Sequence, residues 1–233
     1  MKKVLVIEDD VNIVSLLEIH LKDLSCEVIN ATNGKEGLDI ALQQPFDLII
    51  LDIMVPFMNG MEVCRRARAS RLQTPILILS AKSEEIDKVL ALETGADDYM
   101  TKPFGIREFI ARVNVIFRRS EPGMISRERN SGLLLHFNGL EIDIEMRKIT
   151  LHGARVDLSP KEFELLALLA GNPGKSYSRK RLLNLVWGYE FEGYEHTVNS
   201  HINRLRSKIE PDISRPKYIL TTWGIGYRFN EEA

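Results

Sequence analysis

The run Leu48–Asp52 limits the possible folds of this chain more than any other stretch. Its first four residues are apolar with no polar alternation, which is typical of a strand that is covered on both faces. Asp52 ends the run, and Pro56 and Gly60 mark a loop soon after it. A single aspartate here is most often a turn residue, but open α/β sheets also bind their ligands at the carboxyl ends of strands. The significance of Asp52 therefore depends on which residues end the other strands.

The first 120 residues alternate between short apolar runs and segments with helical spacing. Five strands that alternate with five helices predict an α/β fold, a doubly wound five-stranded parallel sheet whose strand carboxyl ends share one edge. The expected strands are residues 4–7, 27–31, 48–52, 75–79 and 99–101, and the expected helices are residues 13–24, 34–43, 60–69, 84–94 and 106–119.

Charged and hydroxyl side chains follow these strands. Glu8 and Asp9 follow the first strand, so three carboxylates would meet at the shared edge once Asp52 is included. Such a group needs a cation to neutralise it, and ligands that are all oxygen suit Mg²⁺. Ser80 and Lys102 add a hydroxyl and an ammonium at two further strand ends. The set predicts phosphoryl transfer to Asp52, with the metal and Lys102 stabilising the transferring oxygens.

Each of these residues has an ordinary explanation when it is taken alone. The acidic residues could cap a helix, Ser80 could lie in a turn, and Lys102 could be a surface charge. These separate explanations do not account for the placement of all these residues at successive strand ends. An aspartyl-phosphate hydrolase is a different interpretation, but it expects a second carboxylate two residues after the nucleophile. Met54 stands there, so we do not expect an enzyme.

The first 120 residues closely resemble the receiver domain of two-component response regulators. The matching residues are Glu8, Asp9, Asp52, Ser80, Tyr99, Lys102, Pro103 and Phe104. The resemblance implies that a sensor histidine kinase phosphorylates Asp52 and that Ser80 and Tyr99 form a switch pair, with Tyr99 moving inward after phosphorylation. It also implies a cis Lys102–Pro103 peptide bond. The implied Mg²⁺ ligands are Asp9, Asp52, the backbone carbonyl of Met54 and, through water, Glu8. A receiver that no longer accepts phosphate is the remaining alternative, and only a phosphorylation assay separates the two.

The same resemblance implies a homodimer after phosphorylation. The implied face consists of residues 84–94, 99–101 and 106–119. Charged pairs would cross a two-fold axis, each weak but together able to fix the orientation of the subunits. The implied pairs are Lys88 with Glu108, Asp97 with Arg112, and Asp98 with Arg119.

A polar stretch with Pro122, Gly123 and Gly132 and no periodicity predicts a flexible linker at residues 121–132. It separates a domain at 1–120 from one at 133–230. The second domain is predicted to be α+β: short antiparallel strands, three helices and a terminal hairpin, as in a winged helix-turn-helix. The expected strands are residues 133–137, 140–144, 148–151, 154–158, 218–221 and 226–229. Three helices are expected: one that starts after Ser159 and ends at Gly171, one at residues 178–186 and one at residues 195–209.

The charge distribution favours nucleic acid as the partner of this second domain. The chain as a whole has a net charge of −2, yet residues 175–228 hold ten Lys and Arg against five Asp and Glu. Such a local excess suits phosphate contacts, although a solvated basic helix face would produce the same composition. In the third helix Val198, Ile202, Leu205 and Ile209 are spaced to pack inward.

Three motifs resemble the effector domain of the OmpR/PhoB class: residues 158–163, 197–206 and 224–229. The resemblance implies double-stranded promoter DNA as a partner, with the third helix in the major groove, and RNA polymerase as a further candidate. This chain departs from the family at His196, Asn199, Asn203 and Trp223, where Arg, Asp, Arg and a wing Arg are usual. The candidate DNA contacts are Arg179, Trp187, His196, Thr197, Asn199, Ser200, His201, Asn203, Arg204, Arg206, Lys208 and Trp223.

We expect a cytoplasmic protein without a membrane partner. No apolar run approaches the ~20 residues that a membrane span needs. The apolar run at residues 4–7 stops at three acidic residues, far short of a signal peptide. Cys26 and Cys64 lack metal-ligand spacing and are expected to be reduced and packed.

Overall fold

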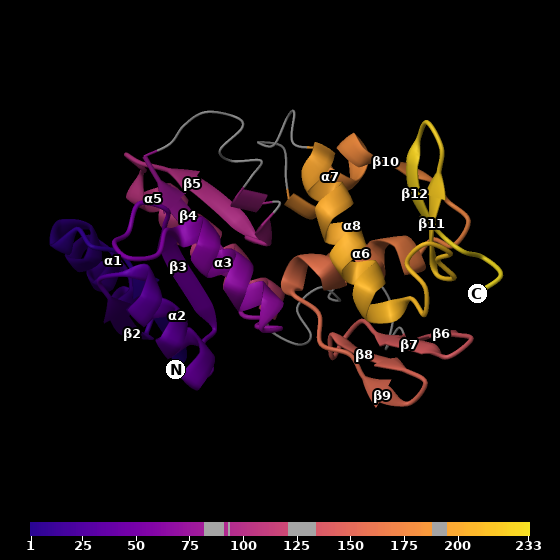
Figure 1. Cartoon of the computed structure of the whole chain (residues 1–233), viewed down its shortest axis with the longest axis horizontal. Coiled ribbons are helices and arrows are strands. Elements are labelled where there is room, and N and C mark those ends of the chain that lie inside the picture. Colours follow the sequence, from indigo (N-terminus) through magenta and orange to yellow (C-terminus); the bar gives the residue numbers. More distant parts are fainter. Residues whose placement is uncertain (82–90, 93, 121–133, 188–194) are drawn as a thin grey trace. The chain divides into compact units, whose positions relative to one another are not determined.

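The computed structural model describes residues 1–81, 91–92, 94–120, 134–187 and 195–233. The chain forms two compact units, Met1–Ser120 and Glu121–Ala233 (Figure 1). The predicted linker and most of the predicted helix at residues 84–94 lie outside the described residues. Among the helices that are described, none is both long and apolar enough to cross a membrane.

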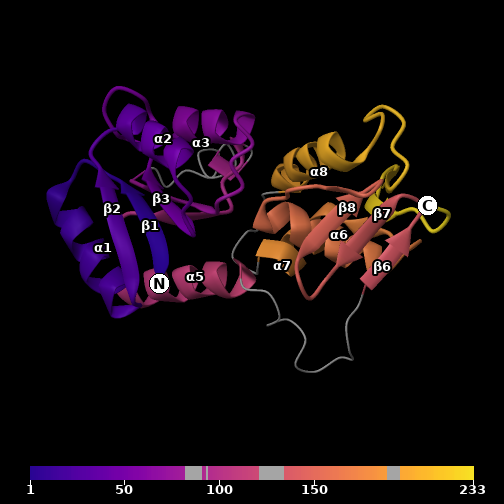
Figure 2. The ribbon, with the colours of Figure 1, turned by 90° about the horizontal axis from the view of Figure 1, so that it is seen from below.

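The first unit is the predicted doubly wound sheet. Its five parallel strands lie in the order β2-β1-β3-β4-β5, and Figure 2 shows α2 and α3 on one face with α1 and α5 on the other. The strands are β1 (Lys2–Ile7), β2 (Cys26–Ala31), β3 (Leu48–Asp52), β4 (Ile76–Ser80) and β5 (Asp98–Thr101), and the helices are α1 (Val11–Asp23), α2 (Gly34–Gln43), α3 (Gly60–Ala69) and α5 (Ile106–Ser120).

Burial on both faces explains why the strands of this sheet are continuously apolar. All five residues of β3 are buried. On one face Leu48 and Ile50 pack in a core with Leu17 of α1 and Phe109 of α5. Full burial of each such side chain stabilises the fold by about 1.5–3 kcal/mol. The central position of β3 therefore follows from its sequence.

Gly60 determines how the chain leaves β3. A Cβ atom on this residue would lie 2.2 Å from the carbonyl oxygen of Asp52, and the Gly60 amide donates to the carbonyl of Ile53 at 2.9 Å. Asn59 then caps α3 by accepting from the amide of Glu62 at 2.9 Å. The loop is thereby folded back tightly against the end of β3, which fixes the backbone next to Asp52.

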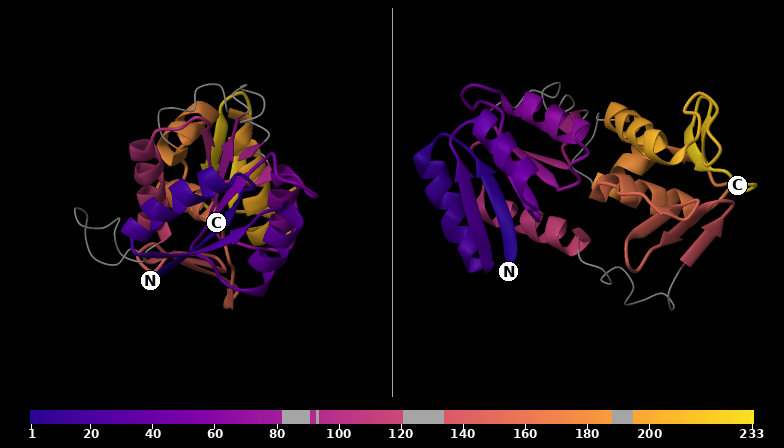
Figure 3. Two further views of the ribbon diagram at one scale, coloured as in Figure 1. Left: turned by 90° about the vertical axis from the view of Figure 1, so that its left-hand side faces the viewer. Right: turned by 60° about the horizontal axis from the view of Figure 1, so that its bottom comes forward.

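The second unit has the predicted order of strands, helices and hairpin. An antiparallel sheet precedes three helices, and a second sheet, in the order β10-β12-β11, includes the terminal hairpin (Figure 3). The strands are β6 (Leu134–Phe137), β7 (Leu140–Asp143), β8 (Lys148–Leu151), β9 (Ala154–Arg155), β10 (Tyr177–Ser178), β11 (Ile219–Thr222) and β12 (Gly226–Phe229), and the helices are α6 (Pro160–Ala170), α7 (Arg179–Trp187) and α8 (Glu195–Ile209).

One predicted strand needs correction, and one short strand was missed. The strand expected at residues 154–158 is only Ala154–Arg155, because the chain turns toward Ser159, which caps α6 together with Glu162. The strand β10 was not predicted at all. It has two residues and exists through pairing with β12, where Tyr177 lies opposite Tyr227, and so short a segment has no periodicity.

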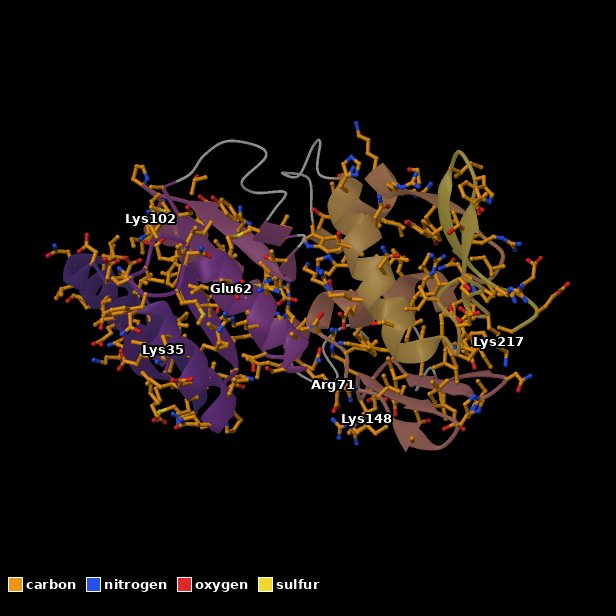
Figure 4. The ribbon with its side chains drawn as sticks, in the orientation of Figure 1. Lys35, Glu62, Arg71, Lys102, Lys148 and Lys217 are labelled. Carbon is orange, nitrogen blue, oxygen red and sulfur yellow. The ribbon has the colours of Figure 1, made fainter. Side chains whose placement is uncertain are left out.

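The end of α8 is fastened to β11 by Glu210. Its buried carboxylate accepts hydrogen bonds from the backbone amides of Lys217, Tyr218 and Ile219 at 2.6–3.1 Å. Lys217, labelled in Figure 4, also donates its Nζ to the carbonyl of Asn138 at 3.0 Å. These contacts hold the hairpin of β11 and β12 in a defined position beside α8.

Candidate functional sites

Three carboxylates lie together at the carboxyl edge of the first sheet. Ligand atoms of Glu8, Asp9 and Asp52 all lie within 4.8 Å of one another. The register explains this, because Ile7 pairs with Leu51 in the parallel β1–β3 ladder and the next residue of each strand projects beyond it. Glu8 is 2% exposed and Asp52 is 6% exposed, while Asp9 is open to solvent.

Lys102 joins the two buried carboxylates. This residue, labelled in Figure 4, lies in the loop after β5, with its Nζ 2.5 Å from Glu8 Oε2 and 2.8 Å from Asp52 Oδ2. Burial raises the pKa of Glu8, and Lys102 only partly opposes the shift. Burial alone would lower the pKa of Lys102, but its hydrogen bonds to Asp52 and Glu8 raise it above the ordinary value. Lys102 therefore stays an ammonium at neutral pH.

This cluster fits a divalent cation. Three carboxyl groups face one ammonium here, and every donor they offer is an oxygen, which suits Mg²⁺. The Met54 amide donates to Asp52 Oδ1 at 3.1 Å and so holds the start of the loop against that carboxylate. The Met54 side chain is exposed, and its thioether has no proton to donate as the general acid of a hydrolase.

The two predicted switch residues are both buried. Ser80 ends β4, and its carbonyl accepts from the Lys102 amide at 2.7 Å. Tyr99 in β5 is 4% exposed, so its ring is buried in this structure. Its movement after phosphorylation stays a prediction. The Lys102–Pro103 peptide bond is cis, as predicted.

The structure corrects the dimer role assigned to Asp97. This side chain is 2% exposed and forms an ion pair with Arg68 at 2.7 Å inside its own unit. It also accepts from the amide of Ile76 at 2.9 Å. A buried carboxylate with these partners cannot form a rim contact with another subunit.

The neighbouring charges lie nearer the surface. Arg112 contacts Asp98 at 3.1 Å and Glu108 at 2.9 Å within the same chain. Arg112 is therefore paired internally rather than with Asp97. Lys88 and the side chain of Arg119 lie outside the described part of the structure.

On α8, the structure separates exposed candidates from buried ones. His196 and Asn203 are exposed and Ser200 is half-buried, which fits a face that meets DNA. Arg206 is a correction: its guanidinium donates to the carbonyl of Ile219 at 2.7 Å and to Thr221 Oγ1 at 2.9 Å. These bonds hold α8 to β11, so the guanidinium of Arg206 is engaged by its own unit rather than by a phosphate.

Asn199 and Arg179 also have internal partners. Asn199 Oδ1 accepts from Arg179 Nε at 2.9 Å and from the Tyr227 hydroxyl at 2.8 Å. This amide thus connects the start of α7 with β12. These two contacts engage the acceptor atom of Asn199, and the expectation that Asn199 contacts DNA stays a prediction.

Trp187, Thr197 and His201 form a buried cluster at the junction of α7 and α8. The His201 ring packs edge-on against Trp187 with centroids 4.9 Å apart, and its Nδ1 lies 3.0 Å from the Thr197 carbonyl. Trp187 Nε1 and Thr197 Oγ1 are buried and have no hydrogen-bond partner in the described parts of the chain. Buried donors without acceptors are costly unless a ligand satisfies them.

The tip of the β11–β12 hairpin is apolar. Trp223 is 91% exposed and Ile225 is half exposed, while Gly224 between them adopts φ = +75°. The indole therefore does not fold back on the unit. It is free to stack or to pack on sugar.

One contact near α8 was missed at the sequence level. Lys208 Nζ lies 2.6 Å from Glu162 Oε2, and Arg204 Nε lies 3.8 Å from Glu162 Oε1. The sequence shows Glu162 only as the third residue of a capping box. No local pattern predicts a partner 46 residues away.

Comparison with known proteins matches both halves of the chain. A family model described as the response regulator receiver domain matches residues 4–114, and one described as "Transcriptional regulatory protein, C terminal" matches residues 153–229. The alkaline phosphatase synthesis transcriptional regulatory protein PhoP of Bacillus subtilis is 44% identical over 233 residues, covering 99% of this chain and 97% of that protein. The transcriptional regulatory protein ResD of the same organism is 41% identical, covering 97% and 95%.

Solved structures agree with these matches. The response regulator DrrB of Thermotoga maritima, an OmpR/PhoB homologue, is 35% identical with a TM-score of 0.50 and covers 99% of each chain. A RitR variant is 28% identical with a TM-score of 0.70, covering 99% of this chain and 100% of that one.

Proposed function

Because this chain belongs to the OmpR/PhoB class of response regulators, we propose that Asp52 is its phospho-acceptor and that phosphorylation there controls promoter binding. The chain is a DNA-binding transcriptional regulator of a two-component system. The observation that carries the proposal is the Lys102 ammonium between Glu8 and Asp52 at the ends of parallel strands. An ammonium within hydrogen-bond distance of Asp52 Oδ2 would also lie next to a phosphoryl group attached to that carboxylate.

The reaction assigned to Asp52 is attack of a carboxylate oxygen on the phosphorus of a kinase phosphohistidine. The P–N bond breaks as the new P–O bond forms, and the imidazole leaves with the electron pair. Lys102, already charged and aimed at this oxygen, stabilises the negative charge on the transferring group. Asp9 and Asp52 would hold Mg²⁺ together with the Met54 carbonyl and, through water, Glu8, and the ion when bound would neutralise phosphoryl oxygens.

Promoter DNA and the sensor kinase are the partners that this assignment needs. Because promoter DNA lies in the cytoplasm, we propose that the protein acts there. RNA polymerase is a further candidate partner. For DNA, the support is an α8 face with exposed polar residues and two buried donors, Trp187 Nε1 and Thr197 Oγ1. We assign these donors, with the adjacent His201, to phosphate oxygens, because phosphate contacts position a protein on the duplex.

We expect phosphorylation to promote a dimer through the face to which β5 and α5 contribute. Reversing one charge there, in Asp98→Arg or Arg119→Asp, should raise the dimer dissociation constant about tenfold or more, because like charges then meet across the two-fold axis. The double reversal should recover most of the loss. Analytical ultracentrifugation of the phosphorylated protein measures this. Asp39→Arg, on α2 at the opposite face of the sheet, is the matched control and should leave dimerisation unchanged.

We expect DNA affinity to depend strongly on Arg204 and little on A·T content beneath the wing. Loss of a bidentate Arg–guanine contact costs about 1–3 kcal/mol and relaxes specificity at one base pair. Trp223 cannot supply the cation that a narrow A·T minor groove attracts. Binding to duplexes that differ only in the flank beneath the wing measures this. Trp223→Arg should create an A·T preference. A large preference in the wild type that Trp223→Ala removes would contradict the assignment.

A further inference from the structure

The turn between β11 and β12 carries two exposed apolar side chains and projects from the rest of its unit (Figure 1). Trp223 is 91% exposed and Ile225 is 51% exposed. With Gly224 between them, these residues form what we call the hairpin tip. No residue from Tyr218 to Tyr227 is charged. Single exposed apolar residues are ordinary, but two neighbouring ones on an uncharged tip indicate a surface that a partner covers.

The hairpin below this tip is anchored to its neighbours. The Ile225 amide donates to the Thr222 carbonyl at 3.0 Å, which closes the turn. Gly226 packs so closely against β10 that a Cβ atom there would lie 2.1 Å from the Tyr177 carbonyl oxygen. Ser176 Oγ and Thr222 Oγ1 are hydrogen-bonded at 3.0 Å. The tip is therefore presented in one position, which lowers the cost of ordering it when a partner binds.

The charges around the hairpin favour a polyanion as that partner. The segment Gly171–Trp187, which contacts the hairpin through Ser176 and Tyr177, has four Lys and Arg and no Asp or Glu. The hairpin is also joined to α8, because Arg206 donates to Thr221 Oγ1 at 2.9 Å. The tip thus continues the α8 surface that we assign to DNA, and β11 and β12 hold no carboxylate that would repel phosphates.

We propose that the hairpin tip is an apolar wedge that enters the minor groove next to the α8 site and inserts the Trp223 indole between two stacked base pairs. This rests on the proposed function, in which α8 docks on promoter DNA. Proteins that bind the minor groove often separate base pairs with apolar side chains, which kinks the duplex. A planar aromatic side chain stacks on any base, so the insertion itself needs no particular base.

The wedge makes affinity depend on the base-pair step beneath it. Opening a step costs stacking energy, and pyrimidine–purine steps unstack and kink most easily. Because this cost differs from one DNA sequence to the next, the wedge discriminates between sequences without hydrogen bonds to their bases. CpA and ApC steps contain the same two base pairs, so a preference for CpA is no preference for A·T. The chain should recognise a step, rather than a base composition, at this end of its site.

The test uses the full chain, treated with a small phosphodonor and Mg²⁺, and a duplex selected from random DNA by the wild-type protein. One set of flanks carries a CpA step at successive positions, and a matched set carries ApC at the same positions. At the position beneath the tip, the CpA duplex should bind ~5-fold or more tightly than its ApC partner. Energy transfer between dyes at the two ends of that duplex should report a bend of about 20° or more. A fluorescent purine analogue at the step should brighten as it unstacks.

Three variants at exposed positions separate the wedge from the rest of the unit. Trp223→Ala should abolish both the CpA preference and the bend. Trp223→Phe keeps a flat apolar ring and should retain most of each. Leu134→Ala removes an exposed apolar side chain from β6, in the other sheet of the same unit, and should change neither. Because none of these side chains is buried, the melting temperature should stay at the wild-type value.

The outcomes distinguish the inference from the function on which it rests. If the wild-type chain binds the selected duplex no more tightly than a scrambled one, the proposed function fails and the inference fails with it. If Trp223→Ala lowers affinity for CpA and ApC flanks equally and the bend is unchanged, the indole packs on sugar and the wedge is wrong. If Trp223→Ala leaves binding to every duplex unchanged, the tip meets a protein instead, and the inference is wrong while the function stands.

Discussion

Asp52→Asn should take up no phosphate from a small phosphodonor in the presence of Mg²⁺, while the wild-type chain gains the mass of one phosphoryl group. The amide has no nucleophilic carboxylate oxygen, so the acyl phosphate cannot form. Asparagine has nearly the same shape as aspartate, so the fold should persist. The remaining cluster of Glu8, Asp9 and Lys102 should stay in place, as the parallel register requires. Intact-protein mass spectrometry measures the uptake.

The matched control is Asp10→Asn. Asp10 follows the cluster in sequence but caps α1, where it accepts from the amide of Asn12 at 2.8 Å, and asparagine caps helices equally well. This variant should be labelled like the wild type. Base-stable phosphate on Asp52→Asn would show that another residue accepts the group. A wild-type chain that takes up nothing would favour the alternative of a receiver that no longer accepts phosphate.

Asp97→Ala should destabilise the first unit by about 3–5 kcal/mol, because it leaves the Arg68 guanidinium buried without its carboxylate. Arg68 also donates to the carbonyls of Leu72, Thr74 and Gly95 at 2.6–3.0 Å. The ion pair therefore ties the end of α3 to the starts of β4 and β5. The loss should lower hydrogen-exchange protection of the β4 amides by roughly a hundredfold or more.

Asp98→Ala is the control one residue away. Asp98 pairs with Arg112, which also pairs with Glu108. Because Asp98→Ala leaves that guanidinium a carboxylate partner, it should destabilise the unit less than Asp97→Ala does. If Asp97 were a rim residue of the dimer, Asp97→Ala would weaken dimerisation and leave β4 exchange unchanged. That result would support the predicted pairing of Asp97 with Arg112 across the dimer.

The sequence by itself determined the layout of both units and the position of the carboxylate cluster. Continuous apolar runs such as Leu48–Asp52 form strands that are buried on both faces. In a parallel sheet every strand ends at the same edge, so Glu8 and Asp52 had to meet once those runs were identified. The capping box at Ser159 and the spacing from Val198 to Ile209 likewise determine helix positions from local chemistry. These features depend on neighbouring residues in the chain and on one rule of topology.

Only the tertiary structure decided which charged residues are available to partners. Asp97 and Asp98 are adjacent and chemically identical, yet one is buried against Arg68 and the other pairs near the surface. Periodicity could not show that Arg206 binds the carbonyl of Ile219. Nor could it show that Glu162 meets Arg204 and Lys208. A helical period indicates which face turns inward, but the partner of a long charged side chain depends on which element packs against that face. Those elements are distant in sequence, and packing brings them together only in the folded protein.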